Sequence, residues 1–313
     1  MLRRRPPSLA KDVMSGQSED KNSDRLGMSE MKLVMTLLVR DEADIVSSNI
    51  DFHLDQGVDF IIATDNLSVD GTTEILRAYE RRGVLHYIHQ ADDDHSQYRW
   101  VTAMARMACT ELAADWVINN DADEFWCPEH GDLKQVLNAV PSSCDGLAAM
   151  RVNFLPGPMA DGDFFADAMI VRECRSLNAL GDPLPGKVCH RGFADIEVEE
   201  GNHSVRRNGN ALVAEPGPIT VLHFPMRSFR QFENKIAKGG AAYERNNYLP
   251  REVGSTLRHL YKVWQRGELE AYYQASVIDA AAIEHGLKDG RFVLDERVRA
   301  RLSRLNRRSA PRN

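Results

Sequence analysis

The sequence contains no apolar run that approaches the ~20 residues needed to cross a bilayer, and it therefore predicts no membrane-spanning helix. The basic residues 1–7 are not followed by an apolar segment, so we expect no secretory signal there. A net charge of −7 leaves the chain without the basic surface that general nucleic-acid binding requires. These absences indicate a cytoplasmic protein that does not bind nucleic acid.

Cysteine is also scarce, and its spacing excludes two classes of site. The five cysteines form no C-x-x-C pair, and their number is odd. This pattern favours reduced thiols over a disulfide framework or a structural zinc site. The cysteines are Cys109, Cys127, Cys144, Cys174 and Cys189.

The two ends of the chain differ in composition from its middle. Residues 1–29 are polar and almost free of aromatic side chains, so we expect a disordered N-terminal arm. Residues 297–312 are strongly basic and are interpreted as a solvated helix end and tail. A weak contact of this tail with an anionic membrane is the alternative, which would place the protein peripherally at a membrane.

Between the two ends, apolar runs of strand length alternate with helical patterns. This alternation predicts βαβ units, and hence an α/β fold with a Rossmann-like, mostly parallel sheet flanked by helices. The early strands are expected at 32–39, 60–64, 84–88 and 116–118, with helices at 45–54, 73–82 and 100–114. Later strands are expected at 146–154, 168–172, 188–193 and 220–224, and helices from residue 229 onward.

Acidic residues follow three of the expected strands. The strand at 32–39 leads into Asp41 and Glu42, the next ends at Asp65, and the fourth leads into Asp121 and Asp123. Carboxyl ends of parallel strands meet at one edge of a sheet, where ligands bind. The alternative is a set of solvated turns and helix N-caps.

The segment around Asp121 predicts a site for a hard cation. On an extended backbone Asp121 and Asp123 point the same way, and Glu124 points to the opposite side. Two neighbouring carboxylates suit Mg²⁺ or Mn²⁺ shared with a substrate phosphate.

Two phosphate-binding motifs are weak or missing. Residues 181–187 match G-x-x-x-x-G-K, but Val188 replaces the required Ser or Thr, so we do not expect a P-loop. Lys187 is interpreted as a surface lysine, with a point-charge contact to a diphosphate as the alternative. No G-x-G-x-x-G follows the first strand, which counts against a dinucleotide-binding domain.

Three segments, taken in order, resemble glycosyltransferase family 2, whose members have the GT-A fold. They are residues 40–45 (Arg-Asp-Glu-Ala-Asp-Ile), 64–72 (Thr-Asp-Asn-Leu-Ser-Val-Asp-Gly-Thr) and 120–126 (Asn-Asp-Ala-Asp-Glu-Phe-Trp). The last contains the family's D-x-D motif, and a looser resemblance extends through residues 221–228. The family's common V-D-D-G-S turn is Thr-Asp-Asn-Leu-Ser here, without the glycine.

The resemblance implies a nucleotide-sugar binding site. Thr36 and Arg40, placed at the end of the first strand, would line the base pocket, and Asp65 would hydrogen-bond the base. Arg99 would approach the ribose or the diphosphate, and Asp121 the ribose and the sugar. A UDP-sugar is the favoured donor.

The resemblance also implies a metal and a division of the chain. Asp123 would hold Mn²⁺ or Mg²⁺, and His223 would be a further ligand, with a packed histidine as its alternative. The GT-A domain would span residues 30–240, with a nucleotide-sugar half at 30–127 and an acceptor half at 128–240. Residues 241–313 would form a helical C-terminal extension with the basic tail.

We therefore expect a metal-dependent glycosyltransferase of the hexosyltransferase type, which moves a sugar to a glycan or small hydroxyl acceptor with inversion. Such enzymes take part in polysaccharide biosynthesis. Inversion requires a general base to deprotonate the acceptor hydroxyl. We favour Asp163, because its neighbours Phe164 and Phe165 suit a sugar acceptor. The other candidates are Asp161, Asp167, Asp195 and Glu197.

Two alternatives remain open. A nucleotidyltransferase acting on a sugar phosphate would share the α/β layout and the acids, but it would need a glycine-rich loop after the first strand. A catalytically inactive GT-A domain that serves as a binding module would be expected to lose Asp121 and Asp123, and both are present.

Overall fold

The computed structural model describes residues 31–309, apart from residues 94–95, 161, 247–248 and 251. The predicted disordered arm at 1–29 lies outside the described residues, and so does the base candidate Asp161. The described residues form a single compact unit. None of the helices in the described part is long and apolar enough to cross a membrane.

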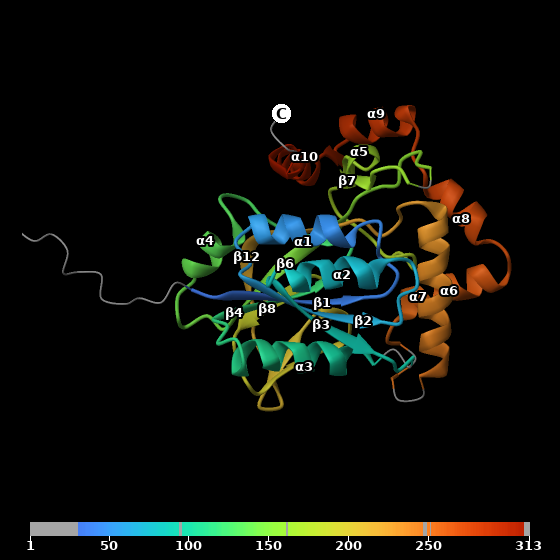
Figure 1. Cartoon of the computed structure of the whole chain (residues 1–313). Coiled ribbons are helices and arrows are strands. Elements are labelled where there is room, and N and C mark those ends of the chain that lie inside the picture. The colour runs from blue at the N-terminus through green and yellow to red at the C-terminus, as the bar shows by residue number, and fades with distance from the viewer. Residues whose placement is uncertain (1–30, 94–95, 161, 247–248, 251, 310–313) are drawn as a thin grey trace, which may run out of the picture. The chain divides into compact units, whose positions relative to one another are not determined.

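An eight-stranded sheet forms the centre of this unit (Figure 1). Its strand order is β3-β2-β1-β4-β8-β6-β12-β5. Strands β3, β2, β1 and β4 are mutually parallel, β8 runs antiparallel between β4 and β6, and β12 is parallel to β6 and antiparallel to β5. The strands are β1 (Leu33–Val39), β2 (Phe60–Asn66), β3 (Leu85–Gln90), β4 (Trp116–Asp121), β5 (Glu124–Pro128), β6 (Gly146–Asn153), β8 (Lys187–Arg191) and β12 (Glu215–His223).

Helices cover both faces of the sheet, which explains why β1 and β4 are buried along most of their length. Figure 1 shows α1 (Val46–Asp55) and α2 (Thr72–Arg81) on one face and α3 (Gln97–Thr110) on the other. Two separate apolar clusters result, one beneath α1 and α2 and one beneath α3. The short α4 (Leu133–Asn138) begins at a capping box formed by Asp132 and Gln135.

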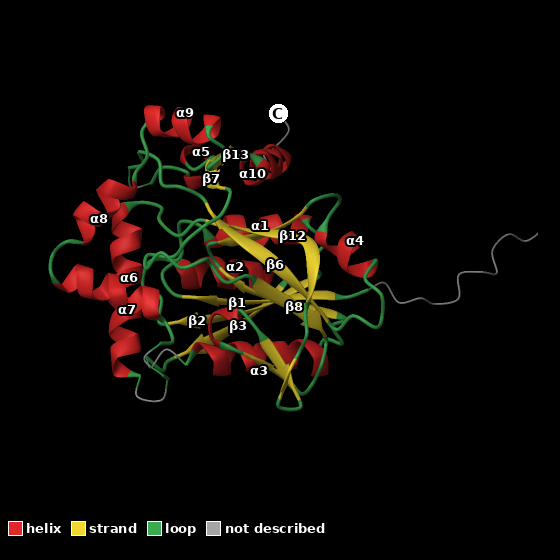
Figure 2. Cartoon of the chain, turned by 180° about the vertical axis from the view of Figure 1, so that it is seen from behind, coloured by secondary structure: helices red, strands yellow, loops and turns green. Residues whose placement is uncertain are grey.

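A helical group stands at the end of the sheet toward which β1, β2 and β3 run (Figure 2). It consists of α6 (Phe229–Arg245), α7 (Ser255–Gln265) and α8 (Leu269–Ser276). These three helices share a third apolar cluster, which holds α6 in place beside the strand ends.

Smaller elements complete the unit. A three-stranded sheet joins β9 to β11 through β10, and β13 pairs antiparallel with β7. The remaining elements are α5 (Phe165–Ala168), β7 (Val171–Glu173), β9 (Ile196–Val198), the 3₁₀ helix η1 (Glu200–Asn202), β10 (Val205–Arg207), β11 (Asn210–Ala211), α9 (Ala280–Lys288), β13 (Phe292–Leu294) and α10 (Arg297–Ser309).

The predicted α/β fold with flanking helices and a helical C-terminal region is confirmed. One predicted strand is wrong in its position: residues 165–168 form α5, and the strand covers Val171–Glu173. Strand β5 was not predicted, because a two-residue turn separates it from β4.

The buried His53 links α1 to β5 by hydrogen bonding, and its titration makes the stability of the fold depend on pH. His53 has its Nδ1 2.8 Å from the carbonyl of Asn49, and its Nε2 accepts a hydrogen bond from the Trp126 amide at 3.1 Å. Burial lowers the pKa of His53 to about 4. The imidazole is therefore neutral in the folded protein, and protonation would remove the acceptor for Trp126.

We expect His53 to destabilise the protein in acid. Because its folded pKa lies below its unfolded value, its contribution is complete above pH 6.5 and is lost as the pH falls toward 4. At pH 5 the loss amounts to about 2 kcal/mol. Melting curves of His53→Gln should show a smaller fall in Tm from pH 7.5 to pH 5 than the native chain, whereas the exposed His285→Gln should match the native slope. Equal slopes for His53→Gln and the native chain would contradict this origin.

Candidate active site

A cavity of about 1440 Å³ opens at the carboxyl ends of β1 and β4. Strand ends form its floor, and α3, the segment around η1, α6 and α7 provide its walls. Register explains the convergence, because Leu38 near the end of β1 pairs with Asp121 at the end of β4. The acidic residues that follow β1 and β4 therefore lie at the same edge of the sheet, as predicted.

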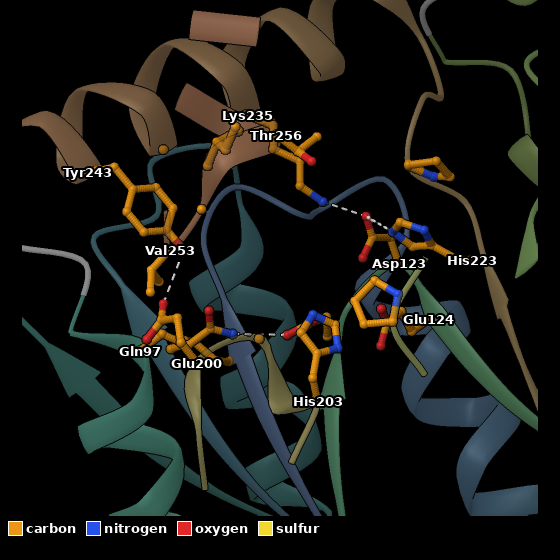
Figure 3. Close-up of a pocket in the computed structure, with 18 of the residues that line it drawn as sticks. Gln97, Asp123, Glu124, Glu200, His203, His223, Lys235, Tyr243, Val253 and Thr256 are labelled. Atoms are coloured by element: carbon orange, nitrogen blue, oxygen red, sulfur yellow. Dashed lines mark hydrogen bonds and ion pairs between the residues drawn. The ribbon is translucent and has the colours of Figure 1, made fainter. Parts of the chain in front are cut away.

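Asp123 lies in the turn between β4 and β5 and is almost fully buried. It forms an ion pair with Lys235 of α6, and its Oδ2 lies 3.4 Å from His223 Nε2 and 3.9 Å from the Arg227 guanidinium. Figure 3 shows Lys235 and His223 both directed at this carboxylate. Burial alone would raise the pKa of Asp123, but these cationic partners hold it well below the usual range.

Asp121 meets a different lysine. Its Oδ2 lies 2.7 Å from Lys187 Nζ, and its Oδ1 accepts hydrogen bonds of 3.3 Å from the side-chain amides of Gln97 and Asn202. Burial opposes the charged form, and the Lys187 ammonium outweighs it, so the pKa of Asp121 is lowered. Asp121 and Asp123 are therefore both ionised and are each neutralised by a separate lysine.

The structure corrects the predicted orientation of Glu124. Lys187 Nζ is also 2.9 Å from Glu124 Oε2, and Arg151 is 3.0 Å from the other carboxylate oxygen. Glu124 therefore shares a counter-ion with Asp121 and does not point away from it. The alternation expected of an extended segment fails because residues 122–123 form a turn.

The interpretation of Lys187 as a surface lysine is also wrong, because its side chain is buried. The preceding G-x-x-x-x-G-K match leads into strand β8 and not into a helix, as expected for a segment that is not a P-loop.

A second group of acids follows β1. Asp41 forms an ion pair with Lys238, and the buried Arg227 bonds both Glu42 and Asp44. The charges of Glu42 and Asp44 outweigh the effect of burial and raise the pKa of Arg227, so it stays charged. The edge of the sheet is thus a network of alternating carboxylates and cations.

Glu200 lies apart from this network. Figure 3 shows Glu200 and Tyr243 on one side of the pocket and Asp123, His223 and Lys235 on the other. Glu200 accepts hydrogen bonds from the Tyr243 hydroxyl at 3.1 Å and from the Tyr98 amide at 3.2 Å. Burial raises the pKa of Glu200 to about 7, despite these two donors.

Five of the residues predicted for the site line the cavity, and three do not. Those in the lining are Arg40, Arg99, Asp121, Asp123 and His223. Thr36 lies in the middle of β1, not at its end, and donates a hydrogen bond of 2.9 Å to Asn119. Asp65 is buried and accepts hydrogen bonds from the Ser68 amide and the Tyr87 hydroxyl.

Asp163, the predicted base, is exposed and does not line the cavity. Its Oδ2 accepts a hydrogen bond of 2.8 Å from the amide of Ala160, which closes a local turn. Among the other base candidates, Asp167 pairs with Arg299 and Asp195 with Arg207, whereas Glu197 lines the cavity.

The sequence reasoning missed the cations and Glu200. Lys235 and Lys238 are three apart on a segment expected to be helical, so they share one helix face. This spacing is the sequence feature from which Lys235 and Lys238 could have been predicted to lie together. Arg227 belongs to the segment 221–228 that carries the looser resemblance, but no role was assigned to it. Nothing in the sequence near Glu200 distinguishes it from the neighbouring Glu199.

The residues at Asp123 do not fit a divalent ion as they are arranged. Within residues 31–309, outside the gaps, no three His, Cys, Asp or Glu side chains are grouped as metal ligands. Asp123 and His223 lie close to each other, but Asp123 already holds the Lys235 ammonium. A metal at this carboxylate would have to displace Lys235.

Residues 35–152 match the sequence model of the family described as glycosyltransferase family 92. The matched segment contains Arg40, Asp121 and Asp123, and it ends before Lys187 and Lys235. The match supports a glycosyltransferase as the enzyme class, as predicted. The predicted membership of family 2 is not confirmed, because the matching model is that of family 92.

Among solved structures, the chain is similar to S. aureus TarS (residues 1–349) in complex with UDP-GlcNAc, with 9% identity, a TM-score of 0.39, and coverage of 83% of this chain and 93% of that chain. The complex of the same TarS fragment with UDP gives 11% identity, a TM-score of 0.38, and coverage of 75% and 72%. Glucosyl-3-phosphoglycerate synthase from Mycobacterium tuberculosis in complex with Mn²⁺, UDP and phosphoglyceric acid gives 11% identity, a TM-score of 0.31, and 80% coverage of each chain. Similarity at this level carries no argument about function. No curated protein sequence matches the chain.

Proposed function

We propose that the cavity binds a nucleotide-diphosphate sugar, with a UDP-sugar favoured, and that the protein transfers the sugar to a hydroxyl of a glycan or other acceptor. The observation that carries this proposal is the ionic network at the strand ends, whose carboxylates Asp121 and Asp123 lie within the segment that matches a glycosyltransferase family. Lys235 and Lys238, both partly exposed at the cavity wall, suit a diphosphate. The volume of about 1440 Å³ exceeds the ~300–1,000 Å³ of common ligand pockets and leaves room for an acceptor beside the donor.

We further propose Glu200 as the general base in place of Asp163. An inverting transfer needs a base on the side of the sugar opposite the leaving diphosphate. Glu200 and Tyr243 occupy the side of the pocket that faces the Asp123 group. A carboxylate with a pKa of about 7 takes up the acceptor proton more readily than an ordinary one and is still ionised in part at neutral pH.

The donor contacts follow from the cavity wall and remain proposals. We assign the ribose and sugar to Asp121, which lines the cavity together with Arg40 and Arg99. The roles predicted for Thr36 and Asp65 at the base are not carried into this proposal, because neither residue lines the cavity. The predicted divalent metal is not part of this proposal, because Asp123 is already paired with Lys235.

Binding of the donor is expected to stabilise the fold. At a UDP concentration of 100 times Kd, stabilisation of about 2.7 kcal/mol should raise Tm by several degrees. Thermal-shift measurements should rank UDP above UMP, and UMP above uridine, because the cations act on the phosphates. The absence of a shift with every uridine nucleotide would contradict the proposed donor.

Product analysis separates the proposed reaction from a nucleotidyltransferase. Incubation with a UDP-sugar should release UDP, by hydrolysis or by transfer. Release of pyrophosphate from a mixture of UTP and a sugar phosphate would favour the nucleotidyltransferase. Strong UDP binding without turnover of any UDP-sugar would favour a binding module.

A further inference from the structure

Lys235 is placed between acids and the open cavity. It projects from α6, forms an ion pair with Asp123, and lies 3.8 Å from a Glu42 carboxylate oxygen. Its side chain keeps 36% of its surface exposed, whereas Asp123 keeps 2%. The ammonium group is therefore anchored by the buried carboxylates on one side and remains accessible to a ligand on the other.

Lys235 stays charged in this position. The carboxylates of Asp123 and Glu42 lie beside the ammonium group and favour its charged form. His223 Nε2 lies 3.4 Å from the same Asp123 oxygen. The lysine makes the closest contact with Asp123, and the buried Arg227 lies 3.9 Å away.

Six carboxylates that follow β1 and β4 are engaged in the same way. Each lies within ion-pair distance of a lysine or arginine. The carboxylates concerned are Asp41, Glu42, Asp44, Asp121, Asp123 and Glu124. A divalent ion bound to Asp123 would be held next to the Lys235 ammonium and the Arg227 guanidinium, and like charges at such distances repel.

We propose that Lys235, anchored on Asp123, supplies the positive charge that a divalent metal was predicted to supply at the diphosphate. This inference rests on the proposed function. As the bond from the anomeric carbon to the diphosphate oxygen breaks, its electron pair stays on the leaving diphosphate, and Lys235 stabilises that charge. The acceptor oxygen forms the new bond to the anomeric carbon, and its proton passes to Glu200. Asp123 acts as a positioning residue for Lys235.

Mn²⁺ alone tests the first half of this inference, through electron paramagnetic resonance of the ion titrated with protein. The native chain should leave Mn²⁺ free. Lys235→Ala should bind Mn²⁺ at least tenfold more tightly, because Asp123 is released, and Asp123→Asn in that background should abolish the gain. Lys288→Ala, which removes an exposed lysine paired with Glu284, is the control and should match the native chain. Tight Mn²⁺ binding by the native chain would overturn the inference.

Calorimetric titration with UDP tests the second half. The Kd of the native chain should agree within about twofold in EDTA and in MnCl₂, and Lys235→Ala should weaken binding in EDTA by tenfold or more. Lys235→Arg keeps the charge and should restore part of the affinity. UDP binding that requires MnCl₂ would overturn the inference and leave the proposed function intact. The absence of UDP binding under both conditions would overturn both.

Discussion

Replacement of Glu200 by Gln is expected to lower kcat by about 10²- to 10⁴-fold, which is the usual contribution of a general base. Gln has the same shape, and its carbonyl oxygen can still accept one of the hydrogen bonds from Tyr243 and the Tyr98 amide. The loss should therefore appear in kcat, with little change in Tm or in the Kd for UDP. Initial rates with a UDP-sugar and calorimetry on the same preparation measure these quantities.

Asp163→Asn is the matched control for this substitution. The Asn side chain can still accept the hydrogen bond from the Ala160 amide, and residue 163 lies outside the cavity lining. We expect nearly native turnover. The opposite result, a large loss with Asp163→Asn and none with Glu200→Gln, would restore the assignment made from the sequence.

The pH profile provides a second readout of Glu200. The base must be ionised to accept a proton, so kcat/KM should rise with pH through about 7 and level off above it. Burial also raises the pKa of Glu42 to about 7, against the charge of Arg227. If the rise of kcat/KM near pH 7 is absent in Glu200→Gln, it reflects the titration of Glu200. If the rise persists in this variant, it reflects Glu42 or another group.

Lys187→Met is expected to destabilise the protein by about 3–5 kcal/mol, the usual cost of removing one partner from a buried ionic group. The substitution leaves Asp121 without its lysine and leaves the fully buried Glu124 with Arg151 as its remaining cation. For a chain of this size the loss corresponds to a fall in Tm on the order of 10 °C. Thermal melts followed by circular dichroism measure it.

A double variant tests whether the loss comes from the excess of buried carboxylate charge. Adding Glu124→Gln removes one buried carboxylate, so Lys187→Met/Glu124→Gln should recover part of the stability. Lys288→Met removes an exposed lysine of similar size and should change stability by at most about 1 kcal/mol. If Lys187→Met and Lys288→Met melted alike, Lys187 would not be the structural counter-ion described above.

Local sequence patterns were sufficient for the parallel part of the sheet, from β3 to β4. Strands β1 and β4 contain apolar runs followed by polar turns, so their burial followed from the sequence, and the alternation of strands with helices predicted a parallel sheet. The insertion of β8 between β4 and β6 did not follow, because antiparallel pairing of such distant segments leaves no local signal. The turn at residues 122–123 was not predicted, because the acidic segment around it was interpreted as extended.

Residues of the candidate site were likewise predicted only where the signal was local in the sequence. Asp121 and Asp123 were found because they lie directly after a strand. Their counter-ions come from β8 and α6, and Lys235 is 112 residues from Asp123 in the chain. The choice of Asp163 rested on its aromatic neighbours, but Phe165 is buried in the apolar cluster beneath α1 and Asp163 remains in solvent.

The separation of Asp123 and Lys235 along the chain has a consequence for biosynthesis. A ribosome adds ~5–20 residues per second, so Lys235 follows Asp123 by on the order of ten seconds. During that interval the newly made strands carry carboxylates whose partners on α6 do not yet exist. Asp41 and Asp123 therefore gain their lysine partners only after α6 has been made.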